Sequence, residues 1–273
     1  MKTPDNLEVF ATHGSYTTPG VLEPHIRPEF DARLRRNFSD FATSSLVQNI
    51  PEKQCLVPKH GRIAGDPNRA TDAEDLFRTT DFNSVQIFKA PLPHDLRDQV
   101  LQESYLPYHR AIVQRLLANH GHAQNLVVAF DVHDTGNLLL AEDPENDVTR
   151  KDVQRWKMPA VIISDQDGQT APEGLLTNLK ASFEKRFGLR SEDVICNWQF
   201  KGGYVTKNYG DPDNLQLQQA IHNRAVVQVE LNRSLYVDEK TQELIPSAIE
   251  HYRTRLTLIF SEVADGYTHR AKP

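Results

Sequence analysis

The stretch "VVAFDVHDTG", from Val127 to Gly136, begins as an apolar run and ends in Asp131, His133, Asp134 and Thr135. An apolar run of this length that is rich in β-branched residues predicts a buried strand. In open α/β folds, ligands bind beyond the carboxyl ends of such strands. The polar end of this run therefore predicts a functional site at the rim of an α/β sheet.

Other short runs rich in Val and Ile also predict strands. They are "LEVFATH", "QCLVPKH", "SVQIFKA", "PAVIIS", "DVICNW" and "RAVVQVELN". Segments with helical spacing of apolar residues separate them. These segments are Pro28–Val47, His94–Asn119, Pro172–Phe187, Leu215–His222 and Gln242–Val263. The alternation predicts an α/β fold, a three-layer α/β/α sandwich around a mostly parallel mixed sheet. The polar segment Asp143–Arg150 is expected to be a surface loop.

The composition is that of an ordinary globular protein, with 38% apolar and 25% charged residues in a chain of 273. No stretch has the composition of a linker, so residues 1–273 are expected to form a single domain. The net charge of -6 is spread along the chain without a basic block. We therefore expect neither nucleic acid nor a membrane surface as a partner.

No apolar run approaches the roughly 20 residues of a membrane span, and the amino-terminal residues lack the pattern of a signal peptide. A cytoplasmic location is the resulting expectation. The chain has only two cysteines, Cys55 and Cys196, which are too few for a disulfide framework or a thiolate zinc site. Any metal site must therefore use histidine and carboxylate ligands.

Three predicted strands end in residues suited to chemistry. His13 follows the first apolar run, and Asp131 and His133 are two residues apart, so they share one face of their strand. Glu230 ends a run in which Val227 and Val229 face the other way, and we expect it to be partly buried.

Each of these residues also has a purely structural interpretation. His13 could be a rim histidine bonded to the backbone, and Asp131 with His133 could be a hydrogen-bonded pair at a strand terminus. Glu230 could form a surface ion pair with Arg233.

The stretch "HGRIAGDPNR" places Arg62 and Arg69 on either side of a tight turn. Guanidinium groups bind carboxylates through two parallel hydrogen bonds, and they also stabilise an oxyanion. A solvated loop is the alternative. The chain contains no GxSxG, GxGxxG or GxxxxGK[ST] motif, which argues against a serine hydrolase of the elbow type and against the common nucleotide-binding loops.

The order of these motifs resembles that of the N-formylglutamate amidohydrolase family, zinc hydrolases related to aspartoacylases and zinc carboxypeptidases. The resemblance runs from His13 to about Glu262. It includes "DPNR", "YLPYH", "DVHDT", "NWQFKGGYVTKNYG" and "VQVELNRSLYVDE". It implies a phosphorylase/hydrolase-like fold of the zinc carboxypeptidase type.

The resemblance implies one Zn²⁺ per chain, or another divalent metal, bound by His13, Asp40 and His133. Such a set leaves a fourth position open for water, as catalytic zinc requires. Because 26 residues separate His13 from Asp40, Asp31 and Glu29 compete with Asp40 for the role of acidic ligand.

Asp131 is expected to orient His133 from the side away from the metal. Glu230 matches the family's catalytic glutamate, and Arg62 resembles the arginine that polarises the scissile carbonyl.

Asn68 and Arg69 match the pair that binds a substrate carboxylate in the related enzymes. Gly202 and Gly203 are expected to let backbone approach the substrate closely, with a simple turn as the alternative, and Arg233 is also expected to bind substrate.

The implied activity is hydrolysis of a small anionic N-acyl amino acid, with N-formyl-L-glutamate as the leading substrate. In this mechanism a metal-activated water attacks the amide while Glu230 acts as general base. One alternative is a binding protein that keeps the fold without turnover. The other is a deacylase or carboxypeptidase that acts on a different N-acyl amino acid or a short peptide.

Overall fold

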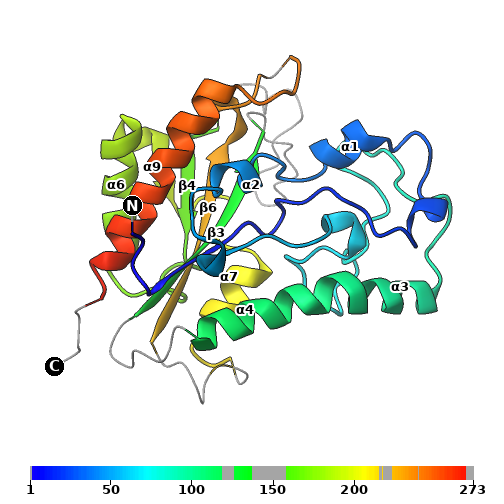
Figure 1. Ribbon diagram of the computed structural model, residues 1–273, viewed down its shortest axis with the longest axis horizontal. Coiled ribbons are helices and arrows are strands. Elements are labelled where there is room, and N and C mark those ends of the chain that lie inside the picture. The colour runs from blue at the N-terminus through cyan, green and yellow to red at the C-terminus, as the bar shows by residue number, and fades with distance from the viewer. Residues whose placement is uncertain are drawn as a thin grey trace.

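A computed structural model describes residues 2–118, 126–136, 158–214, 217, 223–238 and 240–268 of the chain. Among these residues a mixed sheet of six strands has the order β2-β1-β3-β6-β4-β5 (Figure 1). The strands are β1 (Leu7–Phe10), β2 (Cys55–Leu56), β3 (Val127–Thr135), β4 (Val161–Ser164), β5 (Val194–Cys196) and β6 (Arg224–Asn232). Every neighbouring pair is parallel except β4 and β6. The expectation of a mostly parallel mixed sheet is confirmed.

Helices cover both faces of this sheet. One face packs against α2 (Thr43–Leu46), α6 (Leu175–Phe187) and α9 (Pro246–Asp265). The other face packs against α4 (Leu106–Ala118) and α7 (Tyr204–Gly210). Figure 1 shows α6 and α9 along one side of the strands and α4 and α7 along the other. β3 and β6 are therefore buried on both faces, which explains their continuous apolar runs.

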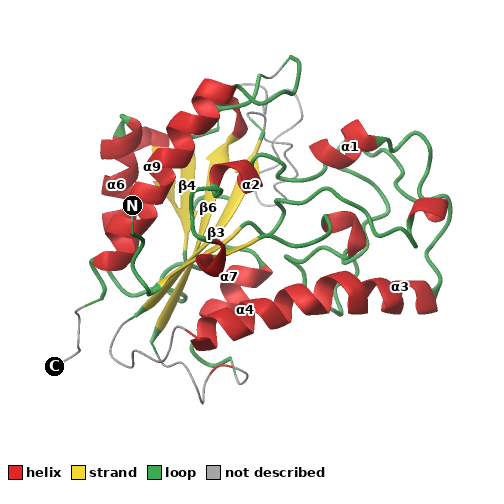
Figure 2. Cartoon of the chain, viewed as in Figure 1, coloured by secondary structure: helices red, strands yellow, loops and turns green. Residues whose placement is uncertain are grey.

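The chain between β1 and α4 builds a second apolar cluster beside the sheet. This part contains α1 (Ala32–Asn37) and α3 (His94–Val100). Its largest buried side chains include Phe30, Leu76 and Ile87, all at most 1% exposed. Figure 2 shows that loops make up much of this region. We call it the loop-rich region, and it carries the "HGRIAGDPNR" stretch.

Short 3-10 turns connect several of the elements. They are Glu23–His25, Glu52–Gln54, Arg62–Ala64, Ser191–Asp193 and Arg233–Leu235. The last of these begins directly after β6, which matters for the position of Arg233.

Three of the predicted helices are confirmed. His94–Asn119 corresponds to α3 and α4, joined by a π-helical turn at Leu101–Tyr105. Pro107 lies just after that turn, and a proline removes one backbone donor from a helix. Pro172–Phe187 and Gln242–Val263 correspond to α6 and α9. The predicted helix Leu215–His222, apart from Leu217, and the predicted loop Asp143–Arg150 lie outside the described residues.

The prediction of a strand in Ser84–Ala90 is wrong. Only isolated bridges occur there, between Thr80 and Gln86 and between Ile26 and Phe88. The apolar side chains of this segment pack into the core of the loop-rich region, so their burial has a cause other than a sheet.

The prediction of one helix over Pro28–Val47 is also wrong, because α1 and α2 are separate. Between them the Asp40 N–H donates to the carbonyl of His13 at 3.1 Å, instead of continuing a helical ladder. This break directs Asp40 toward the end of β1.

The core on the α9 side makes a prediction about stability. Phe260 has no solvent exposure and stacks on Phe130 with ring centroids 4.3 Å apart. Phe260→Ala is expected to lower the free energy of unfolding by about 3–5 kcal/mol, because it removes buried area and leaves a cavity. Denaturant unfolding measures the loss, with Val57→Ala at an exposed position as control. A loss no larger than that of the control would contradict the packing described.

Candidate active site

The carboxyl ends of β1, β3 and β6 meet at one edge of the sheet, because these three strands are neighbours and parallel. His13 follows β1 by three residues, and His133 lies near the end of β3. Glu230 is the register partner of His133 on the adjacent strand. Fold topology alone therefore brings together residues that are far apart in sequence.

Asp40 completes this group from the turn before α2. Its Oδ2 lies 3.2 Å from His13 Nδ1 and 2.8 Å from His133 Nδ1. One ligand atom from each of these three residues lies within 4.8 Å of the others, and all three side chains are buried. Asp31 instead caps the amino terminus of α1, where its carboxylate accepts the Leu34 N–H at 2.9 Å.

Each imidazole contacts a second carboxylate through its Nε2 atom, while its Nδ1 atom faces Asp40. His13 Nε2 lies 2.6 Å from Asp66 Oδ1, and His133 Nε2 lies 3.0 Å from Asp131 Oδ2. Arg62 Nη2 donates to His13 Nδ1 at 2.5 Å, so this nitrogen accepts and the ring proton belongs on Nε2, facing Asp66. The Nδ1 atom therefore presents its lone pair to the space that Arg62 and Asp40 share.

The cluster shifts the pKa values of its members in opposite directions. Burial alone lowers the pKa of His133, but the carboxylates of Asp131 and Asp40 outweigh it and raise that pKa well above its usual value. Burial raises the pKa of Asp40, yet the neighbouring Arg62 guanidinium, together with His13 and His133, holds that pKa well below its usual range. The Asp40 carboxylate thus stays ionised and favours positive charge beside it.

The donor set fits a divalent metal ion. Two imidazole nitrogens and one carboxylate oxygen converge, and each imidazole has a carboxylate partner behind it, as in many zinc sites. The Arg62 guanidinium, which is itself a cation, contacts two of these three residues: its Nη2 lies 2.9 Å from Asp40 Oδ1 and donates to His13 Nδ1. His13, Asp40 and His133 are the residues that could hold a metal here.

Glu230 is the carboxylate best suited to move a proton. Burial is the largest cause that raises its pKa, to about 7, and the charges of Asp40 and Asp134 add to this effect, whereas His133 and His13 oppose it. A group with this pKa exchanges protons readily at neutral pH. Glu230 is 8% exposed, and its ion-pair interpretation with Arg233 does not hold, since Arg233 pairs with Asp134.

Gln228 connects Glu230 to the glycine pair. Its Nε2 donates to Glu230 Oε1 at 2.9 Å, and its Oε1 accepts the Gly203 N–H at 2.5 Å. A Cβ atom at Gly203 would overlap the Asn68 carboxamide, so only glycine permits this approach. Gly202 has a φ of 116°, a conformation that also favours glycine.

Arg62, Asn68 and Arg69 come from the loop-rich region. The Arg62 guanidinium lies over the rings of Phe38 and Phe82, 5.5 and 5.2 Å from their centroids. Asn68 Oδ1 accepts the backbone N–H of Val205 at 2.9 Å, which ties the turn to α7.

Arg69 lies at the more open side of this turn. It donates through Nε to Asp75 at 2.8 Å and through Nη1 to the Asn68 carbonyl, and its side chain is 35% exposed. Burial lowers the pKa of Arg69, but Asp66 and Asp75 outweigh it and raise that pKa, so the charge is secure.

Sequence reasoning missed several residues that support the cluster. Asp66 is part of the quoted "DPNR" motif, and Gln228 shares a strand face with Glu230, so both had a signal that was not used. Thr12 donates to Asp131 Oδ1 and lies 2.9 Å from the hydroxyl of Tyr108. No local sequence pattern predicts the contact between Thr12 and Asp131, because 119 positions separate them.

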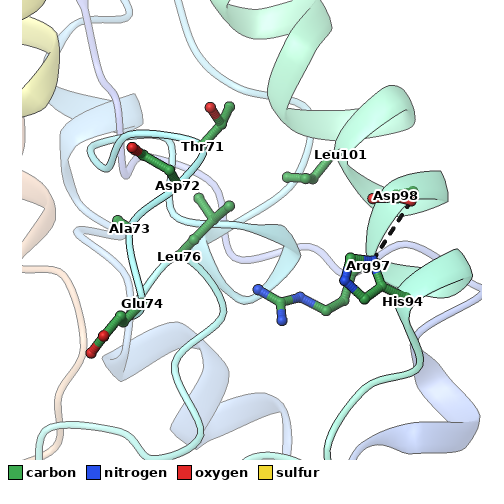
Figure 3. A pocket seen from close by; sticks show the side chains of 9 residues that line it. All are labelled: Thr71, Asp72, Ala73, Glu74, Leu76, His94, Arg97, Asp98 and Leu101. Atoms are coloured by element: carbon green, nitrogen blue, oxygen red, sulfur yellow. Dashed lines mark ion pairs between the residues drawn. The ribbon is translucent and has the colours of Figure 1, made fainter.

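A separate hollow of about 460 Å³ lies in the loop-rich region. Figure 3 shows its lining, with His94, Arg97, Asp98 and Leu101 on one side and the 71–76 segment on the other. None of the predicted site residues lines it, so it is distinct from the cluster.

The fold and the buried cluster define an α/β protein with a candidate active site at the edge of its sheet. The sequence model of the N-formylglutamate amidohydrolase family matches residues 9–237, which is more than half of the chain. The chain therefore belongs to the N-formylglutamate amidohydrolase family, as the order of motifs predicted.

Individual relatives agree with this assignment. An N-formylglutamate deformylase from Pseudomonas aeruginosa is 26% identical over 207 residues, which make up 68% of this chain and 65% of that protein. The aligned part thus spans less than two thirds of that relative's length.

Solved structures share the fold. A crystal structure of N-formylglutamate amidohydrolase from Ralstonia eutropha JMP134 has a TM-score of 0.75 at 19% identity and covers 96% of this chain and 93% of its own. The structure of a gene product from Agrobacterium tumefaciens has a TM-score of 0.61 at 15% identity, with 97% and 92% covered. Within the described ranges, no helix is both long and apolar enough to cross a membrane.

The outer carboxylate of His13 makes a testable prediction. Asp66→Asn is expected to weaken binding of Zn²⁺ about 10–100-fold, because the outer partner fixes the tautomer and orientation of the imidazole. Competition with a chelator of known affinity measures the change. Asp81→Asn is the control, since Asp81 is also buried (6% exposed, against 1% for Asp66) but accepts the backbone N–H groups of Asn83 and Val85 in a loop. Equal affinities for the two variants would show that Asp66 does not orient a ligand.

Proposed function

We propose that this chain is a metal-dependent amidohydrolase that cleaves N-formyl-L-glutamate to L-glutamate and formate. The observation that carries the proposal is the convergence of His13, Asp40 and His133 with Glu230 at one edge of the sheet. Membership of the family and the printed names of the relatives support the choice of substrate.

We propose one Zn²⁺ per chain, held by His13 Nδ1, Asp40 and His133 Nδ1. When bound, such a metal lowers the pKa of a coordinated water toward neutrality and polarises the scissile carbonyl. Imidazole and carboxylate ligands also accept cobalt, manganese or iron, so another divalent metal remains within this proposal. Asp131 and Asp66 keep both imidazoles in the tautomer that donates a lone pair inward.

Glu230 is the proposed general base and acid. Its ionised carboxylate takes a proton from the attacking water, and the same carboxyl group then gives that proton to the nitrogen of the leaving amine. The water oxygen becomes part of formate, and the C–N bond breaks as the amine leaves. Gln228 holds one carboxylate oxygen through this cycle, which leaves the other to exchange the proton.

Arg62 and the "DPNR" turn are proposed to bind the substrate. Arg62 is positively charged and lies against the metal ligands, so it can stabilise the oxyanion that forms from the scissile carbonyl. Arg69 is part-exposed and charged, and with Asn68 it is proposed to bind the substrate carboxylate. Gly202 and Gly203 let backbone approach the same space.

Two wider statements belong to the proposal. Residues 1–273 are proposed to form one domain, since the loop-rich region supplies Arg62 to the cluster at the sheet edge. The fold is proposed to be related to those of zinc carboxypeptidases and aspartoacylases, in agreement with the mixed sheet and the ligand set.

The first test combines metal content with product release. Protein purified without added metal is expected to hold about one zinc per chain by plasma mass spectrometry, and to release equal amounts of glutamate and formate from N-formyl-L-glutamate. His13→Ala and His133→Ala are expected to lose both properties, because each removes one of three ligands. His251→Ala, on the exposed side of α9, is the control.

Other outcomes separate the alternatives. A wild-type protein that holds no metal, even after zinc is offered, would contradict the metal site. Bound metal without turnover of any N-acyl amino acid would favour a binding protein. Turnover of other acyl groups or short peptides in preference to N-formylglutamate would move the substrate assignment and leave the chemistry intact.

The pH dependence tests the role of Glu230. Because only ionised Glu230 accepts a proton, kcat/KM is expected to fall as pH drops below about 7, by roughly tenfold per pH unit. Glu230→Gln is expected to keep its metal but to lose about 10²–10⁴-fold in kcat. Glu8→Gln is the control, since Glu8 is a buried carboxylate on β1 that pairs with Arg115. A Glu230→Gln variant with full activity would rule out this general base.

A further inference from the structure

Arg233 and Asp134 form a buried ion pair at the ends of two adjacent strands. Asp134 belongs to β3 and Arg233 directly follows β6. The Arg233 Nε donates to Asp134 Oδ1 at 2.5 Å, and Nη2 contacts the same carboxylate. The side chains are only 15% and 0% exposed, so this pair is shielded from solvent and its geometry is fixed by the sheet.

Both members of the pair also hold the backbone on either side of Asp40. Arg233 Nη2 donates to the Ser39 carbonyl at 3.0 Å. Asp134 Oδ2 accepts the Ala42 N–H at 3.3 Å. The segment that carries the proposed acidic ligand is thus attached, before and after Asp40, to the rigid ends of β3 and β6.

Asp40 needs such attachment because little regular structure surrounds it. It lies 27 positions after His13, in the turn between α1 and α2, and α2 is a single helical turn. Its own N–H donates to the His13 carbonyl at 3.1 Å, which fixes one point of the turn. The contacts at Ser39 and Ala42 fix the points on either side of it.

We propose that the Arg233–Asp134 pair positions Asp40 for metal binding, and that Arg233 is a positioning residue rather than a substrate-binding one. This inference rests on the proposed metal site. The guanidinium spans two acceptors that point in different directions, which an ammonium group on a flexible stem cannot reproduce. Groups that orient a metal ligand contribute about 10–100-fold in affinity when they are removed.

Arg36 offers a matched control on the same aromatic ring. The guanidinium carbons of Arg36 and Arg233 lie 4.0 and 5.0 Å from the ring centroid of Phe41. The Arg36 guanidinium, however, pairs with Glu243, whose side chain is 69% exposed. The Ser39 N–H donates to the backbone carbonyl of Arg36 at 3.1 Å, a bond that Arg36→Met keeps. Arg36→Met and Arg233→Met therefore each remove one guanidinium group from the ring of Phe41. Arg233→Met alone also removes the contacts with Asp134 and the Ser39 carbonyl that hold the turn at Asp40.

The test has two readouts on the full chain. Arg233→Met is expected to weaken Zn²⁺ binding by about 10–100-fold in a chelator competition, whereas Arg36→Met stays within about twofold of the wild type. In chelator-treated protein, hydrogen exchange of the Asp40, Ala42 and Thr43 amides is expected to accelerate in Arg233→Met alone. Arg233→Lys, which keeps the charge, is expected to fall between wild type and Arg233→Met, and it serves if the methionine variant does not fold.

Two results would overturn the inference. One is metal affinity and amide exchange in the Arg233 variants that match those of Arg36→Met. The other is a raised KM for the substrate in Arg233→Lys with metal affinity and exchange unchanged, since this indicates substrate binding. The hydrogen-exchange measurement needs no metal. A wild-type protein that binds no metal would therefore refute the proposed function, while hydrogen exchange would still decide whether Arg233 and Asp134 hold the turn.

Discussion

The Asp40 carboxylate between two imidazoles is the interaction on which the rest of the site depends. A buried carboxylate is costly unless it is paired and hydrogen-bonded, and here His13, His133 and Arg62 all contact it. Those imidazoles are in turn held by Asp66 and Asp131. With Glu230 nearby, the cluster contains more carboxylates than permanent cations. This excess negative charge raises the pKa of His133, and the same electrostatics favours a divalent cation between the donors.

The order of the strands brings these charged residues together on rigid secondary structure. β1, β3 and β6 are adjacent, so His13, His133 and Glu230 need no long loops to meet. The register that sets His133 opposite Glu230 also sets Asp131 opposite Gln228. Asp131 therefore lies two residues before His133 on β3, and Gln228 lies two residues before Glu230 on β6. The two-residue period of a strand places all four on the same face. Val227 and Val229 point to the other face, where they pack under α9 and keep the register fixed.

Sequence patterns predicted the strand ends well because burial and chemistry are both local there. Continuous apolar runs that end in Asp131, His133 and Glu230 indicated both the strands and their site residues. The Ser84–Ala90 run failed because its apolar side chains fill the core of the loop-rich region, which periodicity cannot distinguish from a sheet. Asp40 could not be separated from Asp31 by spacing, since a three-dimensional contact with His13 and a helix cap with Leu34 decide between them. The partners of Arg233 were equally hidden, because Asp134 lies 99 positions away.

The division between sheet edge and loop-rich region also separates two proposed tasks. The proposed metal ligands and Glu230 are buried and attached to strands or to backbone that strands hold, which suits chemistry that tolerates little displacement. Arg69, the last residue of the "DPNR" turn, has a side chain that is 35% exposed and lies on a loop, where recognition residues commonly occur. Arg62 and Asp66 link the two parts, since both come from the loop-rich region and contact His13, and Arg62 also contacts Asp40. The position of Arg62 therefore couples the loops that are proposed to recognise the substrate to the cluster proposed to cleave it, and changes in those loops can alter selectivity while the cluster stays in place.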